Sequence, residues 1–308
     1  MADVVRITAT GAGLSYYPEF VARHLGFFED EGVTVETEAP GYGHWAPSSV
    51  RNGTADLALG GIWRPILYRD KLDHFMPFAC IVQRCPVVLL SREPRPDFAW
   101  GDLVGQRVAI GEGAPSPFIA VFATLRAKGV DPASVNFVTH FMAQEARDFF
   151  LSGICDFYIV AAPASDALVA EGAGHQVASF VAEAGALPWS VYYSLPAFLT
   201  ERRGAAERFA AALQRALNWI HAHDPEEAMV VLERSWPGVP AAVTLKAARD
   251  AKALGMWPRT VRLEEDQLER WQKILVESRL FDAPVAYDEI FAEGPSLAAI
   301  AKYPPAGG

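Results

Sequence analysis

The sequence predicts an α/β fold with two similar α/β lobes joined by a two-segment hinge, and a helical C-terminal extension packed on lobe one. The first observation is a repeat, because NGTADLALGG at 52–61 returns as SGICDFYIVA at 152–161. In each copy an aspartate follows a glycine by three residues, and an apolar run comes next. Glycine suits the left-handed position after a helix, and such a run is typical of a strand buried on both faces.

A second match at the same offset supports the duplication. Gly11 and Gly13 near the start of the chain correspond to Gly111 and Gly113. The third observation is a pair of long β-prone runs, residues 78–90 and 189–195, which can carry the chain into the second lobe and back. Two crossings make lobe one discontinuous and place a hinge between the lobes. We expect lobe one to comprise residues 1–88 and 190–308, and lobe two to comprise residues 89–189.

The elements of lobe one follow from periodicity. Residues 18–31 carry an apolar stripe at helical spacing that ends at Gly32, and Val33–Thr37 alternates as a strand. Two glycines and two prolines in 40–47 mark a loop, and a short helix runs from there to Arg51.

Lobe two repeats this order. A helix is expected over 117–128, a strand over 135–139, and a second helix after Phe141. The apolar positions of the first helix fall at i, i+3, i+4 and i+7, which is the spacing of one buried face. The glycine-rich loop of lobe one has no counterpart here, so the lobes differ at a place where ligand specificity can be built.

The remainder of the chain reads as helical. One helix carries Phe209, Leu213 and Leu217 on a single stripe, and a late helix buries its own stripe of Leu268, Trp271 and Leu275. Between them, Asp224 followed by Pro225 predicts a helix start, since aspartate caps and proline favours the first position.

Bulk composition excludes several classes of protein. The 308 residues are 51% hydrophobic and 21% charged, with a net charge of −10, which disfavours nucleic acid and anionic membranes as partners. No apolar run approaches the roughly 18 residues of a membrane span, so no direct membrane insertion is expected. The start of the chain shows no secretory signal, so the protein is cytoplasmic, or periplasmic if a signal was removed.

Three cysteines cannot form a disulfide framework, and the spacing of Cys80 and Cys85 puts them on opposite faces of a strand.

Several segments together carry a family resemblance. They are ARHLGFFEDEGVTVE at 22–36, GTADLA at 53–58, LVGQRVA at 103–109 and the helix at 209–225. Across nearly its whole length the chain resembles type II periplasmic substrate-binding proteins of the nitrate, taurine, alkanesulfonate and thiamine-pyrimidine group. The resemblance implies a monomer that traps a small molecule between two lobes and delivers it to the membrane subunits of an ABC importer. It implies no cofactor.

The carboxyl ends of the predicted strands are where ligands bind in open α/β sheets. The loops there carry many of the chain's aromatic residues, and Tyr16, Trp63 and Trp189 are our first choices for rings that stack on a planar ligand. Each ring could instead pack inside the protein core without contacting a ligand. Lobe-two amides at residues 113–116 would hold an acceptor group. The full set of candidate ligand contacts is Tyr16, Tyr17, His44, Trp63, Arg64, Glu112, Gly113, Ala114, Ser116 and Trp189.

Three charged or titratable candidates leave alternatives open. His44 is either solvated or a donor to a ligand, and Arg64 is either a ligand-binding cation or half of a surface ion pair. Glu112, ionised beside a helix start, could receive N–H groups, which argues against a purely anionic ligand such as nitrate. The glycine pairs lack the third glycine and acidic residue of a dinucleotide site. An aromatic or heteroaromatic ligand with polar substituents fits this set.

The alternative is a cytoplasmic enzyme on the same fold. Relatives of this kind include an aromatic sulfinate desulfinase that uses a cysteine where this chain offers Ser15, and a thiamine-pyrimidine synthase with a cysteine-rich motif that this chain lacks. A decarboxylase-like reaction needs little beyond a desolvated pocket and a proton donor, a role His44 could fill. No metal-ligand or Ser–His–Asp spacing stands out. A sensor would bind its ligand and change its association state, whereas an enzyme would consume the ligand.

Overall fold

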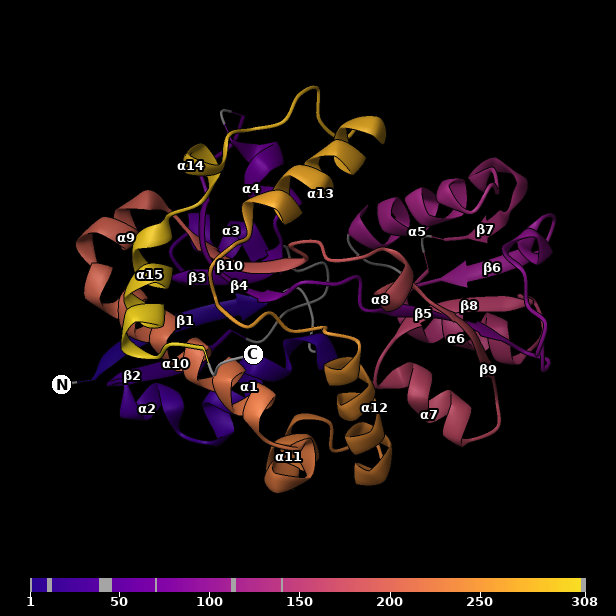
Figure 1. Cartoon of the computed structure of the whole chain (residues 1–308), viewed down its shortest axis with the longest axis horizontal. Coiled ribbons are helices and arrows are strands. Elements are labelled where there is room, and N and C mark those ends of the chain that lie inside the picture. Colours follow the sequence, from indigo (N-terminus) through magenta and orange to yellow (C-terminus); the bar gives the residue numbers. More distant parts are fainter. Residues whose placement is uncertain are drawn as a thin grey trace.

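The chain folds around two five-stranded sheets that lie next to each other (Figure 1). The computed structural model describes residues 2–9, 13–38, 46–69, 71–111, 115–139 and 141–305. The first sheet has the order β2-β1-β3-β10-β4, with β1 Asp3–Ala9, β2 Val33–Thr37, β3 Leu57–Gly61, β4 Met76–Val82 and β10 Ser190–Ser194. The second has the order β7-β6-β8-β5-β9, with β5 Val87–Ser91, β6 Arg107–Ile110, β7 Asn136–Val138, β8 Phe157–Ala161 and β9 His175–Ser179.

The two sheets share one topology. In the first, β2, β1 and β3 are parallel and β10 pairs antiparallel with both β3 and β4. In the second, β7, β6 and β8 are parallel and β5 pairs antiparallel with both β8 and β9. The antiparallel strand of each sheet is the one that arrives from the other lobe. The predicted fold of two α/β lobes with two crossing segments is therefore confirmed.

The crossings are short. The chain leaves the first sheet after Val82 and enters the second at Val87, and it returns between Ser179 and Ser190. The expected boundary at residues 88/89 falls inside β5, and the boundary at 189/190 falls where β10 begins. The limits of the two lobes as separate units remain our proposal.

Helices cover the faces of both sheets. In the first lobe these are α1 Tyr17–His24, α2 Phe27–Asp30, α3 Ala46–Arg51 and α4 Trp63–Tyr68, preceded by a short 3-10 helix at Leu14–Tyr16. In the second they are α5 Pro115–Ala127, α6 Ala143–Leu151, α7 Ala164–Ala170 and α8 Phe180–Glu183. One expectation was wrong, because the single helix over 18–31 is divided into α1 and α2. Gly26 takes a left-handed conformation there, with φ of +77°, and this interrupts the helical ladder.

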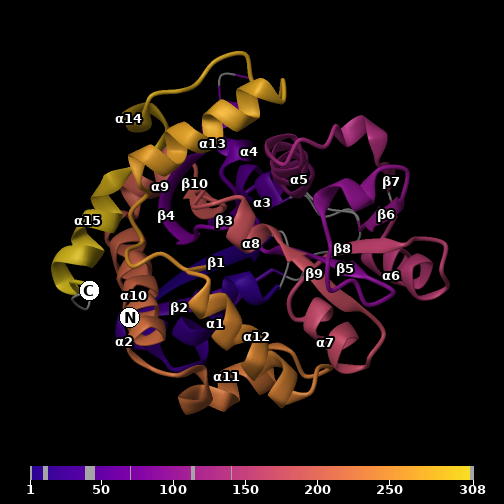
Figure 2. The ribbon, with the colours of Figure 1, turned by 45° about the vertical axis from the view of Figure 1, so that its right-hand side comes forward.

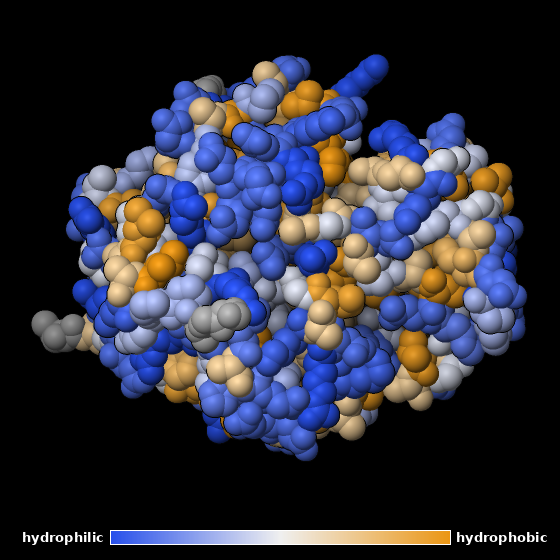
Figure 3. All heavy atoms as spheres, in the orientation of Figure 1, coloured by the Kyte–Doolittle hydropathy of each residue, from blue (hydrophilic) through white to orange (hydrophobic). Residues whose placement is uncertain are grey.

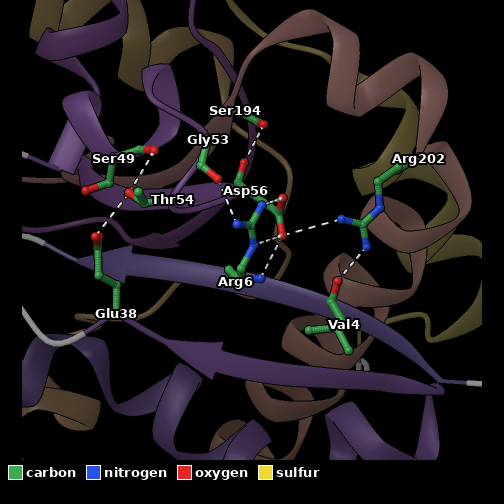
Figure 4. Close-up of polar contacts among 9 residues, drawn as sticks. All are labelled: Val4, Arg6, Glu38, Ser49, Gly53, Thr54, Asp56, Ser194 and Arg202. Atoms are coloured by element: carbon green, nitrogen blue, oxygen red, sulfur yellow. Dashed lines mark hydrogen bonds and ion pairs between the residues drawn. The ribbon is translucent and has the colours of Figure 1, made fainter.

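The glycine and the aspartate of the motif have the same structural roles in both repeats. Gly53 and Gly153 have φ of +74° and +81°, as expected for glycines that follow a helix. Asp56 accepts the backbone N–H of Arg6, and Asp156 accepts that of Arg107 (Figure 4 shows the first case). The repeat thus ties β3 to β1 in one lobe and β8 to β6 in the other.

The C-terminal part is helical, as predicted, and consists of α9 Pro196–Glu201, α10 Arg203–Ala222, α11 Met229–Ser235, α12 Ala241–Ala253, α13 Glu265–Glu277, α14 Tyr287–Ile290 and α15 Glu293–Lys302. Helix α10 packs on α1, α2 and α15, and α15 also contacts β4, so the extension covers lobe one. It reaches further than expected, because α12 packs on α7 and α13 on α5 of the second lobe (Figures 1 and 2).

The predicted details of this extension are confirmed. The Asp224 side chain accepts a hydrogen bond from the Glu226 N–H at the start of a 3-10 turn, and the stripe on α13 is buried. On the face drawn in Figure 3, apolar residues gather in small separate groups among polar ones. Among the described residues, no helix is both long and apolar enough to cross a membrane.

Candidate functional site

A cavity of about 450 Å³ lies where the two lobes meet. Gly13, which follows β1, contributes to it from the first lobe. The second lobe contributes the carboxyl ends of β6 and β8 and the first turns of α5 and α6. Its other lining residues are mainly apolar and include Ile110, Pro117, Phe118, Ile159 and Ala161. This is the edge of the sheets at which the sequence predicts ligand binding.

The two lobes touch at this cavity. The Leu14 N–H donates to the Ala162 carbonyl oxygen across 3.2 Å, which joins the segment after β1 to the segment after β8. Gly13 and Ala162, which lie at this contact, both line the cavity. The structure therefore presents the lobes in contact.

The cavity has few polar side chains. The Tyr158 hydroxyl donates to the Ala143 carbonyl oxygen at 3.3 Å, and burial raises the pKa of Tyr158, so it stays a neutral donor. Arg147 lies at the edge and forms an ion pair with Glu171 at 3.5 Å. Sequence analysis did not single out Phe118, Tyr158 or Arg147, because each sits in a regular helix or strand pattern that looks like core or surface.

Trp63 and Arg64 form the first turn of α4, directly beyond β3. Both are buried, with exposed fractions of 5% and 9%. The Arg64 guanidinium carbon lies 4.6 Å from the centroid of the Trp63 ring. Trp63 Nε1 and Arg64 Nε and Nη1 have no hydrogen-bond partner among the described residues. Arg64 is thus buried, and no carboxylate in the described part of the chain forms an ion pair with it.

Ser116 connects this pair to the second lobe. An ideal Cβ built on Gly61 would lie 2.6 Å from Trp63 Cδ1 and 3.1 Å from Ser116 Oγ, so the glycine allows both side chains to approach. Ser116 is buried in the first turn of α5, and the next residue, Pro117, lines the cavity. Since Pro115 and Pro117 have no N–H, Ser116 alone supplies a backbone donor over 115–117.

The other predicted aromatic contacts lie deeper. Tyr16 is buried, and its hydroxyl accepts a hydrogen bond from Ser190 Oγ at 3.5 Å. Tyr17 packs with its ring centroid 5.4 Å from that of Trp257, and burial raises its pKa. Trp189 lies in the second crossing with its ring 5.8 Å from Trp271. None of these three rings lines the 450 Å³ cavity, and their contact with a ligand remains a prediction.

The remaining candidates, His44, Glu112, Gly113 and Ala114, lie outside the described residues. So do most of the glycine-rich loop at 40–47 and the glycines at 11 and 113. The part of the chain that the structure describes contains no group of three or more His, Cys, Asp or Glu placed to hold a metal ion. All three cysteines are free and buried.

A larger cavity, of about 800 Å³, lies elsewhere. It runs between α13 and the segment at 284–288, and acidic side chains such as Glu265, Glu269 and Asp288 surround it. All of its lining residues belong to the C-terminal extension. Both lobes line the smaller cavity, whereas only the C-terminal extension lines the larger one.

Comparison with known proteins agrees with this geometry. A sequence model of the family described as "NMT1/THI5 like" matches residues 15–228. The chain belongs to the NMT1/THI5 like family. This match covers both crossings and every strand except β1, so the family resemblance of the sequence is confirmed.

Individual relatives of this NMT1/THI5 like chain are distant. It is 22% identical over 289 residues to "Putative binding protein YtlA" of Bacillus subtilis (strain 168), covering 93% of this chain and 86% of the relative. The periplasmic aliphatic sulphonate binding protein SsuA from Escherichia coli shares the fold, with a TM-score of 0.73, 18% identity and coverage of 94% and 98%. The desulfurization enzyme DSZB also shares it, with a TM-score of 0.67, 17% identity and coverage of 98% and 99%.

Proposed function

We propose that this protein is a solute-binding protein that traps a small planar ligand, aromatic or heteroaromatic with polar substituents, between its lobes for an ABC importer. The observation that carries the proposal is the cavity of about 450 Å³ lined by both lobes at the carboxyl ends of their strands. Its size falls in the range of small-molecule sites, and its mainly apolar lining suits an aromatic ring.

The two crossings support closure by hinge motion. The antiparallel strand of each sheet begins directly after a crossing, and the two crossings, at 83–86 and 180–189, link the sheets along the chain. Rotation about two short segments can open and close a cleft while each sheet keeps its hydrogen bonds. The hydrogen bond from Leu14 to Ala162 is then a contact of the closed form.

The partners follow from the same role. The sequence relative YtlA is named as a putative binding protein, and the sulphonate-binding SsuA shares this fold. We therefore propose that the closed, ligand-bound protein docks on the membrane subunits of an importer and that it acts as a monomer. Export to the periplasm through a removed signal would fit this role.

The test is ligand binding by aromatic-ring variants. A thermal-shift screen of pyrimidines, aromatic carboxylates and sulfonates should find a compound that raises the melting temperature. Trp63→Ala and Trp189→Ala should each weaken its binding at least about tenfold, measured at a temperature where each variant is folded, which is about 1.4 kcal/mol. Trp219→Ala is the control, because Trp219 lies on α10, which contributes no residue to the cavity lining, and stacks on His223 just after that helix. Normal binding by both Trp63 and Trp189 variants would show that the cleft is misplaced.

A further inference from the structure

The buried donors of Trp63 and Arg64 have no acceptor among the residues that the structure describes. Indole Nε1 and the guanidinium nitrogens can only donate hydrogen bonds. A buried donor without an acceptor is costly, and a buried charge without a counter-ion more so. Three such atoms, Trp63 Nε1 and Arg64 Nε and Nη1, lie on two adjacent residues. Their shared requirement is an acceptor that carries negative charge.

Nearby tyrosines do not supply that charge. Tyr193 is buried, its hydroxyl has no partner among the described residues, and Arg64 acts on it electrostatically. Burial nevertheless raises the pKa of Tyr193 more than Arg64 lowers it, so the phenol stays neutral. No carboxylate in the described ranges forms an ion pair with Arg64, although most other arginines there have one.

The pair also faces the place where the lobes meet. The Trp63 ring and the Ser116 hydroxyl both lie close to the backbone of Gly61, on the side where a Cβ would project. Ser116 belongs to the turn of α5 whose next residues, Pro117 and Phe118, line the cavity between the lobes. A group bound by Trp63 and Arg64 would therefore lie beside the cavity and within reach of the second lobe.

We propose that the ligand carries an anionic group, such as a carboxylate, sulfonate or phosphate, which Arg64 and Trp63 Nε1 bind while Ser116 contacts it from lobe two. The inference rests on the proposed function and narrows its ligand to a ring with an acidic substituent. The ring occupies the apolar cavity, and the acid occupies the donor pair. A neutral amide of the same shape would leave the Arg64 charge unbalanced and bind more weakly.

The first test uses the ligand-free protein. Because Arg64 has no counter-ion among the described residues, Arg64→Met, which keeps the length of the side chain, should melt at or above the wild-type temperature. If Arg64 served only to stabilise the fold, Arg64→Met would lower the melting temperature by more than about 2 °C. Arg95→Met is the matched control, since Arg95 also covers an aromatic ring, 4.9 Å from Phe157, but bonds Ser91 within lobe two.

The second test measures charge selectivity by calorimetry with benzoate against benzamide, and benzenesulfonate against benzenesulfonamide. The wild type should prefer each anion by about tenfold or more, as expected for charge-assisted hydrogen bonds. Arg64→Gln should abolish the preference, mainly by weakening the binding of the anion, while Trp63→Phe should reduce the preference in part. Arg95→Gln should keep it.

Unchanged selectivity in Arg64→Gln, or a lower melting temperature in Arg64→Met, overturns the inference. Failure of the proposed function has a different signature. In that case no aromatic probe, charged or neutral, changes the melting temperature of the wild type.

Discussion

Arg6 and Asp56 join the first strand of the chain to the turn before the third. The Arg6 N–H and Nε donate to Asp56 Oδ2 at 2.8 and 3.3 Å, and Arg6 Nη2 donates to Oδ1 at 2.8 Å. Arg6 Nη1 also donates to the Gly53 carbonyl oxygen, and Arg202 approaches Asp56 from the start of α10 (Figure 4). The equivalent pair in lobe two, Arg107 and Asp156, makes fewer and longer contacts.

This difference between the lobes predicts unequal effects of one substitution. Asp56 is 11% exposed and Asp156 31% exposed. Asp56→Asn should cost about 2 kcal/mol of unfolding free energy, because it removes several charge-assisted hydrogen bonds from a buried site. Asp156→Asn should cost clearly less. Urea unfolding of the two variants checks this, and equal losses would contradict it.

The contribution of Asp56 should depend on pH. Partial burial acts to raise the pKa of Asp56, but the hydrogen bonds from Arg6 outweigh burial and leave the pKa below its ordinary value of 3.8. A folded-state pKa below the unfolded one stabilises the protein above the unfolded value, and the stabilisation is lost as the pH falls through the folded value. The difference in unfolding free energy between wild type and Asp56→Asn should be constant from pH 7 to about 5 and shrink below 3.8. A difference that grows on acidification would refute this assignment.

Replacing Gly61 even with alanine should destabilise the protein. A Cβ there would lie 2.6 Å from the Trp63 ring and 3.1 Å from Ser116 Oγ, which requires the ring or the α5 turn to move. Gly61→Ala should cost about 1–3 kcal/mol and weaken ligand binding, because it separates the lobes at the donor pair. Gly101→Ala, at a position with open space, is the control. Isothermal titration together with thermal melts separates the two effects, and unaltered binding would argue against a role for this contact.

The cysteines should be inert in the folded protein. Burial raises the thiol pKa of Cys80 and Cys85 to about 12 and raises that of Cys155 as well. Since the thiolate is the reactive species, an aromatic disulfide reagent at pH 8 should label none of the three until a denaturant is added. Fast labelling of any one of them in the native protein would show that lobe opening exposes it.

The internal repeat made the fold predictable from sequence. Gly53 and Gly153 both have a positive φ, and the aspartate that follows each one ties two strands together. Because each role depends on one residue type at a fixed spacing, a short motif is enough to reveal it. The break at Gly26 was missed because Phe27 and Phe28 continue the apolar stripe of α1. The packing of α12 on α7 was also missed, since it depends on contacts between residues far apart in the chain.

The site was less accessible to sequence reasoning. Trp63 and Arg64 were named from their place after a strand, but whether Arg64 is paired depends on every side chain around it. Phe118 and Tyr158 line the cavity from within regular elements, where sequence gives no sign that one face of a helix or strand end meets the other lobe. His44 and Glu112 lie outside the described residues, so their role stays a prediction.

The central claim is that the protein traps a small molecule between its lobes and releases it unchanged. Native mass spectrometry of the protein incubated with the best compound from the screen, followed by release under denaturing conditions, tests this most directly. The account predicts one compound per chain, recovered at its original mass, with occupancy lost in Trp63→Ala. Recovery of a chemically converted compound would instead assign the protein to enzymes that use this fold.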